Sequence, residues 1–209
     1  MTRNEEKKLR KKKALMDSAY QLFTSIGYQK TTILFIATRA GVANGTFYRY
    51  FKDKEDIRDA LIVQKSSELL QDAIDSLDVM HSALPPEEKL VAVTDFIITR
   101  LSKDIALLRF IAKNLSWGLF MKAGEYHAQD ESIIDFQDFV TRTLMDDGIE
   151  MTQELQLTIF TILELISSTC YSVILDGEPV TLSEYKPFLY DTIRTLFRAK
   201  TEPAAKAAG

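Results

Sequence analysis

The side chains with the clearest chemical potential are the cations at the N-terminal end of the chain. Residues 7–13 read KKLRKKK, and residues 1–54 hold 12 Lys and Arg against 4 Asp and Glu. Residues 55–209 reverse this balance, with 14 against 26. A small basic end on an acidic body favours contact with a polyanion. A run of charged residues is more often only a solvent-exposed face. The basic run therefore indicates a nucleic-acid partner only if the neighbouring residues form a nucleic-acid-binding fold.

Few residues suit other kinds of chemistry. Cys170 is the single cysteine, which excludes an intrachain disulfide and fits a reducing compartment. His81 and His127 have no partners at metal-ligand spacing, and no phosphate-binding loop or nucleophile–base constellation is visible. The charged N-terminus lacks the apolar segment of a signal peptide. We therefore expect a cytoplasmic protein that is not an enzyme and that uses no metal and no cofactor.

The elements that must position these cations are helices almost throughout. Apolar residues recur at helical spacing, while glycine and proline mark the ends of segments. This pattern predicts helices at residues 7–26, 32–40, 44–50, 54–79, 87–101, 103–121, 128–146, 152–175 and 183–199. No segment has the convincing alternation of a strand, so we expect an all-α protein of about nine helices. The expected domains are residues 1–56 and residues 57–202, followed by a frayed tail at residues 203–209.

Three short helices around a tight turn at Gly41 form a candidate helix-turn-helix domain at the N-terminus. In this motif the second helix of the pair enters the major groove of DNA while the first crosses the backbone. The entering helix here is residues 44–50, which is too short to be stable without neighbours. Asp53 is expected to cap the helix that follows. Apolar side chains of adjoining helices are expected to brace the motif: Leu22, Phe23, Ile36, Ala37, Ala40 and Phe47.

The same segment resembles the N-terminal domain of TetR-family repressors. The matching stretches, within residues 14–57, are AYQLFTSIGYQKTT and IATRAGVANGTFYRYFKDKEDI. The family pattern has an apolar helix ending in Phe-x-x-x-Gly-Tyr, then Thr-Thr, then Ile-Ala-x-x-Ala-Gly-Val, and closes with Gly-x-Phe/Leu-Tyr-x-Tyr/His-Phe-x-x-Lys. The match is ordered and covers about the first quarter of the chain. The resemblance implies a helix-turn-helix regulator whose partner is a double-stranded DNA operator.

The resemblance also implies roles for individual residues. Arg49 would face guanine, because its forked donors match O6 and N7, although a phosphate contact is an equal alternative. Asn44, Gly45 and Thr46 would face the groove, with Gly45 letting the backbone come close. Ala43 and Asn44 replace the Ser or Lys of many family members, which leaves the operator sequence open. The expected phosphate contacts are Thr31, Thr32, Tyr48, Tyr50 and Lys54.

Two long helices near the C-terminus are the expected dimer interface. Residues 155–175 are apolar on nearly every face, with one stripe formed by Leu155, Ile159, Ile162, Ile166, Cys170 and Val173. Glu164 and several hydroxyls within this segment fit a helix buried on two sides better than a membrane span. Two copies of this helix and of residues 183–199 would make a four-helix bundle, which resembles how the family dimerises. A homodimer supplies the two recognition helices that a palindromic operator needs.

Aromatic side chains of the larger domain are candidates for lining a small-molecule pocket, although a single aromatic residue at helical spacing is more often a core residue. They are Phe110, Trp117, Phe120, Met121 (the one non-aromatic), Tyr126, Phe136, Phe139 and Tyr171. Our hypothesis is a repressor that releases its operator when an unidentified small-molecule effector binds, through the helix that joins the two domains. Control by a protein partner or by oxidation of Cys170, and activation in place of repression, are the alternatives. The apolar neighbourhood of Cys170 argues for an inert thiol.

Overall fold

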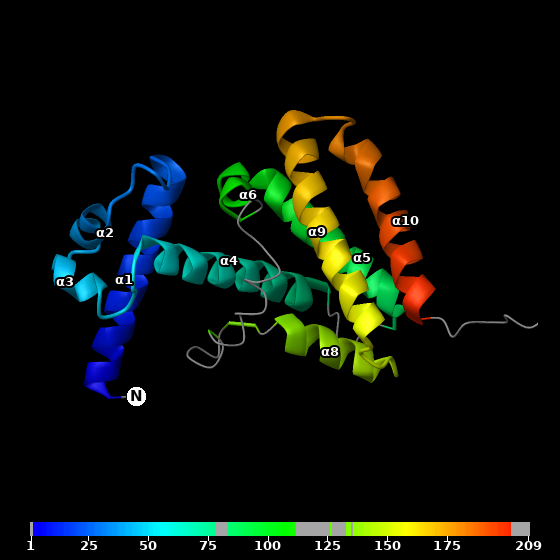
Figure 1. Cartoon of the computed structure of the whole chain (residues 1–209), viewed down its shortest axis with the longest axis horizontal. Helices are drawn as coiled ribbons and strands as arrows, with labels where there is room; N and C mark the ends of the chain where they lie inside the picture. Colours follow the sequence, from blue (N-terminus) through cyan, green and yellow to red (C-terminus); the bar gives the residue numbers. More distant parts are fainter. Residues whose placement is uncertain (1, 78–82, 112–125, 127–132, 135, 202–209) are drawn as a thin grey trace, which may run out of the picture. The chain divides into compact units, whose positions relative to one another are not determined.

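The structure is a computed structural model that describes residues 2–77, 83–111, 126, 133, 134 and 136–201, with the backbone alone at residues 136–139. Within these residues the chain forms nine helices and no strand, which confirms the all-α prediction (Figure 1). It divides into two compact units, residues 1–64 (unit 1) and residues 65–209 (unit 2). The division falls inside a single helix, α4 (Lys54–Leu77), which therefore contributes residues to both units. The expected tail at residues 203–209 lies outside the described residues.

Unit 1 consists of α1 (Arg3–Ser25), α2 (Ile33–Arg39), α3 (Asn44–Phe47) and the first turns of α4. The helix α1 begins earlier than residue 7, where the sequence pattern placed its start, because Thr2 and Glu5 form a reciprocal capping box. The Thr2 amide donates to Glu5 Oε2 at 2.6 Å, and the Glu5 amide donates to Thr2 Oγ1 at 3.4 Å. The basic run at residues 7–13 is therefore helical.

The recognition segment is shorter as an α-helix than the predicted residues 44–50. After Phe47 the chain tightens, since the amides of Arg49 and Tyr50 donate to the carbonyls of Thr46 and Phe47 at 3.2 and 2.9 Å. Phe47 itself is fully buried. Four of the residues expected to brace the motif are also buried, namely Phe23, Ile36, Ala37 and Phe47.

The start of α4 is capped as predicted. Asp53 Oδ1 accepts hydrogen bonds from the amides of Glu55 and Asp56 at 2.9 and 2.8 Å. Asp56 Oδ2 accepts in turn from the amide of Lys52 at 2.8 Å. This reciprocal arrangement satisfies amides that the first turn of a helix leaves without a backbone partner, and it fixes where α4 leaves the helix-turn-helix.

Unit 2 contains the rest of α4 and the helices α5 (Pro86–Lys103), α6 (Ile105–Ile111), α8 (Phe136–Asp146), α9 (Gln153–Asp176) and α10 (Leu182–Thr201). The helix α10 packs on α9 and α5, and α6 contacts both α5 and α9. The central cluster joins α5, α9 and α10 through Val91, Ile98, Ile162, Cys170, Leu189 and Ile193. The predicted helices at residues 103–121 and 128–146 fall partly on residues 112–125, 127–132 and 135, which lie outside the described residues.

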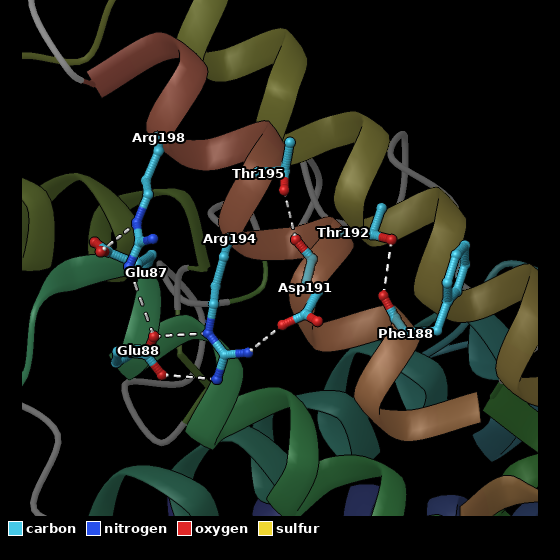
Figure 2. Close-up of polar contacts among 8 residues, drawn as sticks. All are labelled: Glu87, Glu88, Phe188, Asp191, Thr192, Arg194, Thr195 and Arg198. Atoms are coloured by element: carbon cyan, nitrogen blue, oxygen red, sulfur yellow. Dashed lines mark hydrogen bonds and ion pairs between the residues drawn. The ribbon is translucent and has the colours of Figure 1, made fainter. Parts of the chain in front are cut away.

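A row of ion pairs links α10 to α5 along their antiparallel contact. Figure 2 shows the side chain of Arg194 between the carboxylates of Glu88 and Asp191. Arg194 Nε lies 2.7 Å from Glu88 Oε1, and Arg198 Nε lies 2.8 Å from Glu87 Oε1. The hydrogen bond from Arg194 holds the pKa of Glu88 below its ordinary value of 4.5. These pairs fix the register of α10 on its own unit.

Candidate nucleic-acid interface

The α3 segment presents most of its predicted contact residues to solvent while Phe47 anchors it from below. Asn44, Gly45 and Arg49 are exposed, and Tyr48 is 57% exposed. The ring of Tyr48 stands edge-on to Phe47, with ring centroids 5.5 Å apart, so an internal contact orients it. Ala43, the residue that begins the helix, offers no side-chain cap to the first amides of α3. The other two predicted residues, Thr46 and Tyr50, are half-buried.

Packing within unit 1 does not require a glycine at position 45 of α3. A Cβ added at Gly45 meets no atom within 4 Å, and its φ lies outside the left-handed region. Gly41, by contrast, ends α2 with φ +66°, a conformation that L side chains rarely adopt. Glycine inside a helix costs about 0.5–1 kcal/mol relative to alanine. The contacts of Gly45 within the described residues do not account for this cost, whereas close approach of a partner to its backbone would.

The two threonines before α2 have different surroundings. Thr32 is exposed, and its Oγ1 accepts a hydrogen bond from the amide of Phe35 at 3.1 Å, as an N-cap does. Thr31 is only 1% exposed, and its hydroxyl donates to the carbonyl of Gly27 at 2.9 Å. Its amide donates to the carbonyl of Tyr28 at 3.3 Å. Both donors of Thr31 are thus committed inside the unit, so the structure lends no support to its expected phosphate contact.

Lys54 was expected to bind a phosphate, and the structure gives its ammonium an internal role. Lys54 Nζ donates to the carbonyls of Tyr28 and Thr31, each at 2.9 Å. It also lies 4.2 Å from the centroid of the Tyr28 ring, which Arg58 approaches at 5.0 Å. Lys54 thus holds the turn that leads into α2. The ammonium of Lys54 still contributes a positive charge, but two of its hydrogen-bond donors already have acceptors inside the unit.

The basic run of α1 forms a helical surface beside this motif. Residues 3–11 are all exposed, and in Figure 1 these first turns of α1 extend beyond α2 and α3. Lys8, Lys11 and Lys12 precede the buried Leu15 at helical spacing, so they continue the face on which unit 1 packs. Arg10 and Lys13 fall on the opposite face.

Unit 2 contains an apolar cavity of about 70 Å³. Among the described residues, five helices contribute to its wall, through Leu70, Pro86, Lys89, Leu90, Val93, Val140, Thr143, Leu144, Ile159, Ile162, Leu163 and Phe197. Sequence reasoning missed this site, because side chains that line a cavity show the same apolar periodicity as side chains that fill a core. Among the described lining residues Lys89 is the one charged side chain.

The predicted aromatic pocket residues do not coincide with this cavity where they can be placed. Phe110 is buried in α6, while Tyr126 and Tyr171 are half-buried, and none of the three belongs to its lining. The other predicted residues lie outside the described part of the chain, or have side chains that do: Trp117, Phe120, Met121, Phe136 and Phe139. A role for these five stays a prediction.

The helix-turn-helix segment matches a known protein family. Residues 15–61 match the family model of bacterial regulatory proteins of the tetR family. The N-terminal domain is therefore a TetR-family helix-turn-helix domain. The matched residues run from the buried face of α1 to the first turns of α4, so the family domain is the one that presents α3. The basic turns before residue 15 lie outside the match.

Several proteins similar to this chain are transcriptional regulators. It is 25% identical to the HTH-type transcriptional regulator YhgD of Bacillus subtilis over 159 residues, which is 74% of this chain and 80% of that protein. It is 33% identical over 94 residues to the fatty acid metabolism regulator protein of B. subtilis, covering 45% of this chain and 43% of that protein. The solved FadR of B. subtilis, in complex with stearoyl-CoA, has the same fold with a TM-score of 0.54 and 21% identity, covering 86% and 96% of the two chains.

Proposed function

We propose that this TetR-family regulator is a cytoplasmic homodimeric repressor that releases a palindromic operator when an apolar small molecule occupies unit 2. The observation that carries the DNA-binding part is the outward face of α3, where Gly45 has no internal reason to be glycine. Asn44, Thr46 and Arg49 supply groove-facing donors, and Thr32, Tyr48 and Tyr50 supply phosphate contacts. Arg49 is the residue that we assign to base recognition.

The surface of α9 and α10 supports a homodimer. Within α9 an 18-residue stretch has a mean hydropathy of 1.6, which would let it cross a membrane by length and composition alone, yet only 28% of that stretch is buried. Leu157 of α9 is 57% exposed and Phe188 of α10 is 66% exposed. A helix that is apolar on most faces needs cover on more than one side. A second copy of α9 and α10 provides that cover and completes a four-helix bundle about a twofold axis.

The cavity supports an effector with an apolar group. Carbon atoms dominate its wall, and Lys89 and Thr143 are its polar lining residues among those described. One relative is a regulator of fatty acid metabolism, and another was solved with stearoyl-CoA. Fatty acyl compounds are therefore the first effector class that we assign to this chain. Leu70 of α4 lines the cavity, and α4 begins in unit 1, so this helix is the connection through which occupancy would reach the helix-turn-helix.

Release of the operator by acyl compounds tests this function. A coupling of about 1–3 kcal/mol between the two sites weakens DNA binding about 5- to 150-fold. The purified protein is bound to labelled DNA from upstream of its own gene, and acyl-CoAs and fatty acids of increasing chain length are added. Dose-dependent release supports the proposal. If the protein binds acyl compounds but its DNA affinity does not change, acyl compounds do not control it. It would then still be a DNA-binding regulator.

Redox control is the alternative that the structure disfavours. Cys170 is 4% exposed, and burial raises the pKa of its thiol to about 11. A protonated, enclosed thiol reacts slowly with oxidants, because the thiolate is the nucleophile. We therefore expect the Cys170→Ser variant and the unsubstituted protein to respond alike to peroxide in the DNA-binding assay.

A further inference from the structure

Lys89 is a buried cation in the wall of an apolar cavity. Its side chain is 7% exposed, and its Nζ donates to Asp147 Oδ1 and Oδ2 at 2.9 and 2.8 Å. The aliphatic stem of Lys89 lies among the lining residues contributed by α5 and its neighbours. Removing a charged group from water is costly unless an opposite charge accompanies it, so a buried lysine needs a carboxylate as its partner.

Asp147 is the more exposed partner of this pair. It follows the last residue of α8, and its side chain is 23% exposed, about three times as exposed as that of Lys89. The residue after it, Gly148, adopts φ +76°, so the chain turns away from α8 at this point. Asp147 can therefore return to water at small cost if another carboxylate takes its place, whereas the ammonium of Lys89 cannot.

We propose that Lys89 recognises the carboxylate of an apolar monocarboxylic acid, and that Asp147 holds the place which this carboxylate takes. The apolar group of the acid fills the cavity, and its carboxylate exchanges with Asp147 on the Lys89 ammonium. This inference rests on the proposed effector role of the cavity and adds the chemical group by which the effector is chosen. A charged hydrogen-bonded pair in such surroundings changes binding about 10-fold or more.

Exchange with Asp147 also connects occupancy to α8. In the structure the Lys89–Asp147 pair ties α5 to the end of α8, and α8 supplies Val140, Thr143 and Leu144 to the cavity wall. A bound acid releases this tie while it fills the space beside α8. The effector thereby favours an arrangement of α8 that the unliganded protein does not hold, which is the differential contact that a ligand switch requires.

Isothermal titration calorimetry of the full chain without DNA tests the proposal, with octanoate as the acid and 1-octanol as its uncharged match. We expect octanoate to bind the unsubstituted protein more tightly than 1-octanol. Lys89→Met should weaken octanoate about 10-fold or more and leave 1-octanol within about threefold. Asp147→Asn should tighten octanoate about 3- to 30-fold, because it removes the competing carboxylate.

The sign of the Asp147→Asn effect separates recognition from a structural tie. A pair that only holds α5 to α8 predicts that Lys89→Met and Asp147→Asn weaken both ligands alike, which would overturn the proposal. Equal binding of octanoate and 1-octanol by the unsubstituted protein would overturn it as well. The double variant Lys89→Met/Asp147→Asn leaves no unpaired charge, so it should fold and bind both ligands equally; a retained preference for octanoate contradicts the proposal.

The DNA assay distinguishes this inference from the proposed function. If octanoate binds with the expected variant pattern but never releases the operator, the carboxylate site stands and effector control fails. If acyl compounds release the operator while Lys89→Met keeps its preference for octanoate, effector control stands and the role of Lys89 is wrong.

Discussion

Gly45 and Lys54 of the helix-turn-helix have different surroundings, which their residue types alone do not reveal. Gly45 and Lys54 both fit the family pattern as DNA contacts, yet Gly45 faces open space while Lys54 is bonded to carbonyls of its own unit. Thr31 shows the same limit, since a threonine beside an N-cap looks identical in sequence whether its hydroxyl points outward or into a turn. Such outcomes depend on where a turn places its carbonyls, which residue spacing does not encode.

Substitution of Gly45 should change stability and DNA binding in opposite directions. Gly45→Ala adds a methyl group in open space and improves helix propensity, so we expect a free energy of unfolding equal to or up to about 1 kcal/mol above that of the unsubstituted protein. Operator affinity should fall about 10-fold or more, because the methyl group keeps the backbone from the DNA. Gly148→Ala is the matched control: its φ of +76° predicts lower stability with normal operator binding by the folded fraction. Unchanged operator affinity of Gly45→Ala would remove Gly45 from the interface.

Lys54→Met tests whether the lysine is a clamp or a phosphate contact. Lys54→Met removes two charge-assisted hydrogen bonds, to the carbonyls of Tyr28 and Thr31. We expect the free energy of unfolding, measured by urea titration, to fall by about 1.5–3 kcal/mol. The slope of log affinity against log salt should stay within experimental error, because no phosphate contact is lost. A slope that flattens by about one, with stability unchanged, would show that Lys54 binds a phosphate in the complex.

At the scale of elements, the start of α1 determines what its cations can do. Periodicity of apolar residues could not place this start, because residues 3–13 carry almost none, whereas the Thr2–Glu5 capping box could have been found as a Thr-x-x-Glu signal. A helix holds its lysines at fixed angles. The face that continues Leu15 is therefore distinct from the face of Arg10 and Lys13.

Neutralising the two faces of α1 should have unequal effects. We expect Lys8→Gln/Lys11→Gln/Lys12→Gln to flatten the salt slope of operator binding by about two to three units, since each phosphate contact contributes about 0.9. The control Arg10→Gln/Lys13→Gln should change the slope by less than about one unit. Equal flattening per charge on both faces would mean that the run acts through net charge alone.

The α5–α10 ion pairs should make stability depend on pH in the acidic range. The pKa of Glu88 is lowered in the folded protein by its hydrogen bond from Arg194, so its contribution is present above the ordinary value of 4.5 and is lost as pH falls through the lowered value. Glu88→Gln should therefore lower Tm at pH 7, with a difference that shrinks toward pH 3. The exposed Glu150→Gln serves as the control. A Tm difference that is the same at pH 7 and pH 3 would show that this pair contributes no pH-dependent stability.

At the scale of the whole molecule, helical class and the position of the helix-turn-helix could be predicted from apolar periodicity and glycine stops. The cavity and the burial of Lys89 could not be predicted from the sequence. Lysine side chains usually face water, and the partner of Lys89 lies 58 residues further along the chain. Within the described part of the chain, α9 and α10 expose large apolar side chains such as Leu157 and Phe188, which a single copy leaves unexplained. Their partner, in our account, is the same pair of helices in a second copy.

A charge on this face should separate the two copies. Phe188→Glu should convert the dimer to monomers in sedimentation equilibrium and abolish tight operator binding, because each copy then offers one recognition helix. Met145→Glu, on α8 and 61% exposed, is the matched control and should remain dimeric. A dimeric Phe188→Glu variant with full operator affinity would place the interface elsewhere.

A single titration shows whether α3 reads a specific DNA site as part of a dimer. The protein is titrated into labelled DNA from upstream of its own gene with an excess of unrelated competitor, alongside sequences selected from random DNA. We expect binding that survives the competitor, at two subunits or a multiple of two per site, to a sequence with twofold symmetry. Arg49→Ala should relax base preference at one position in each half-site, at a cost of about 1–3 kcal/mol. Equal, strongly salt-dependent affinity for all DNAs, with no sequence enriched by selection, would contradict specific recognition by α3 and leave only non-specific phosphate binding.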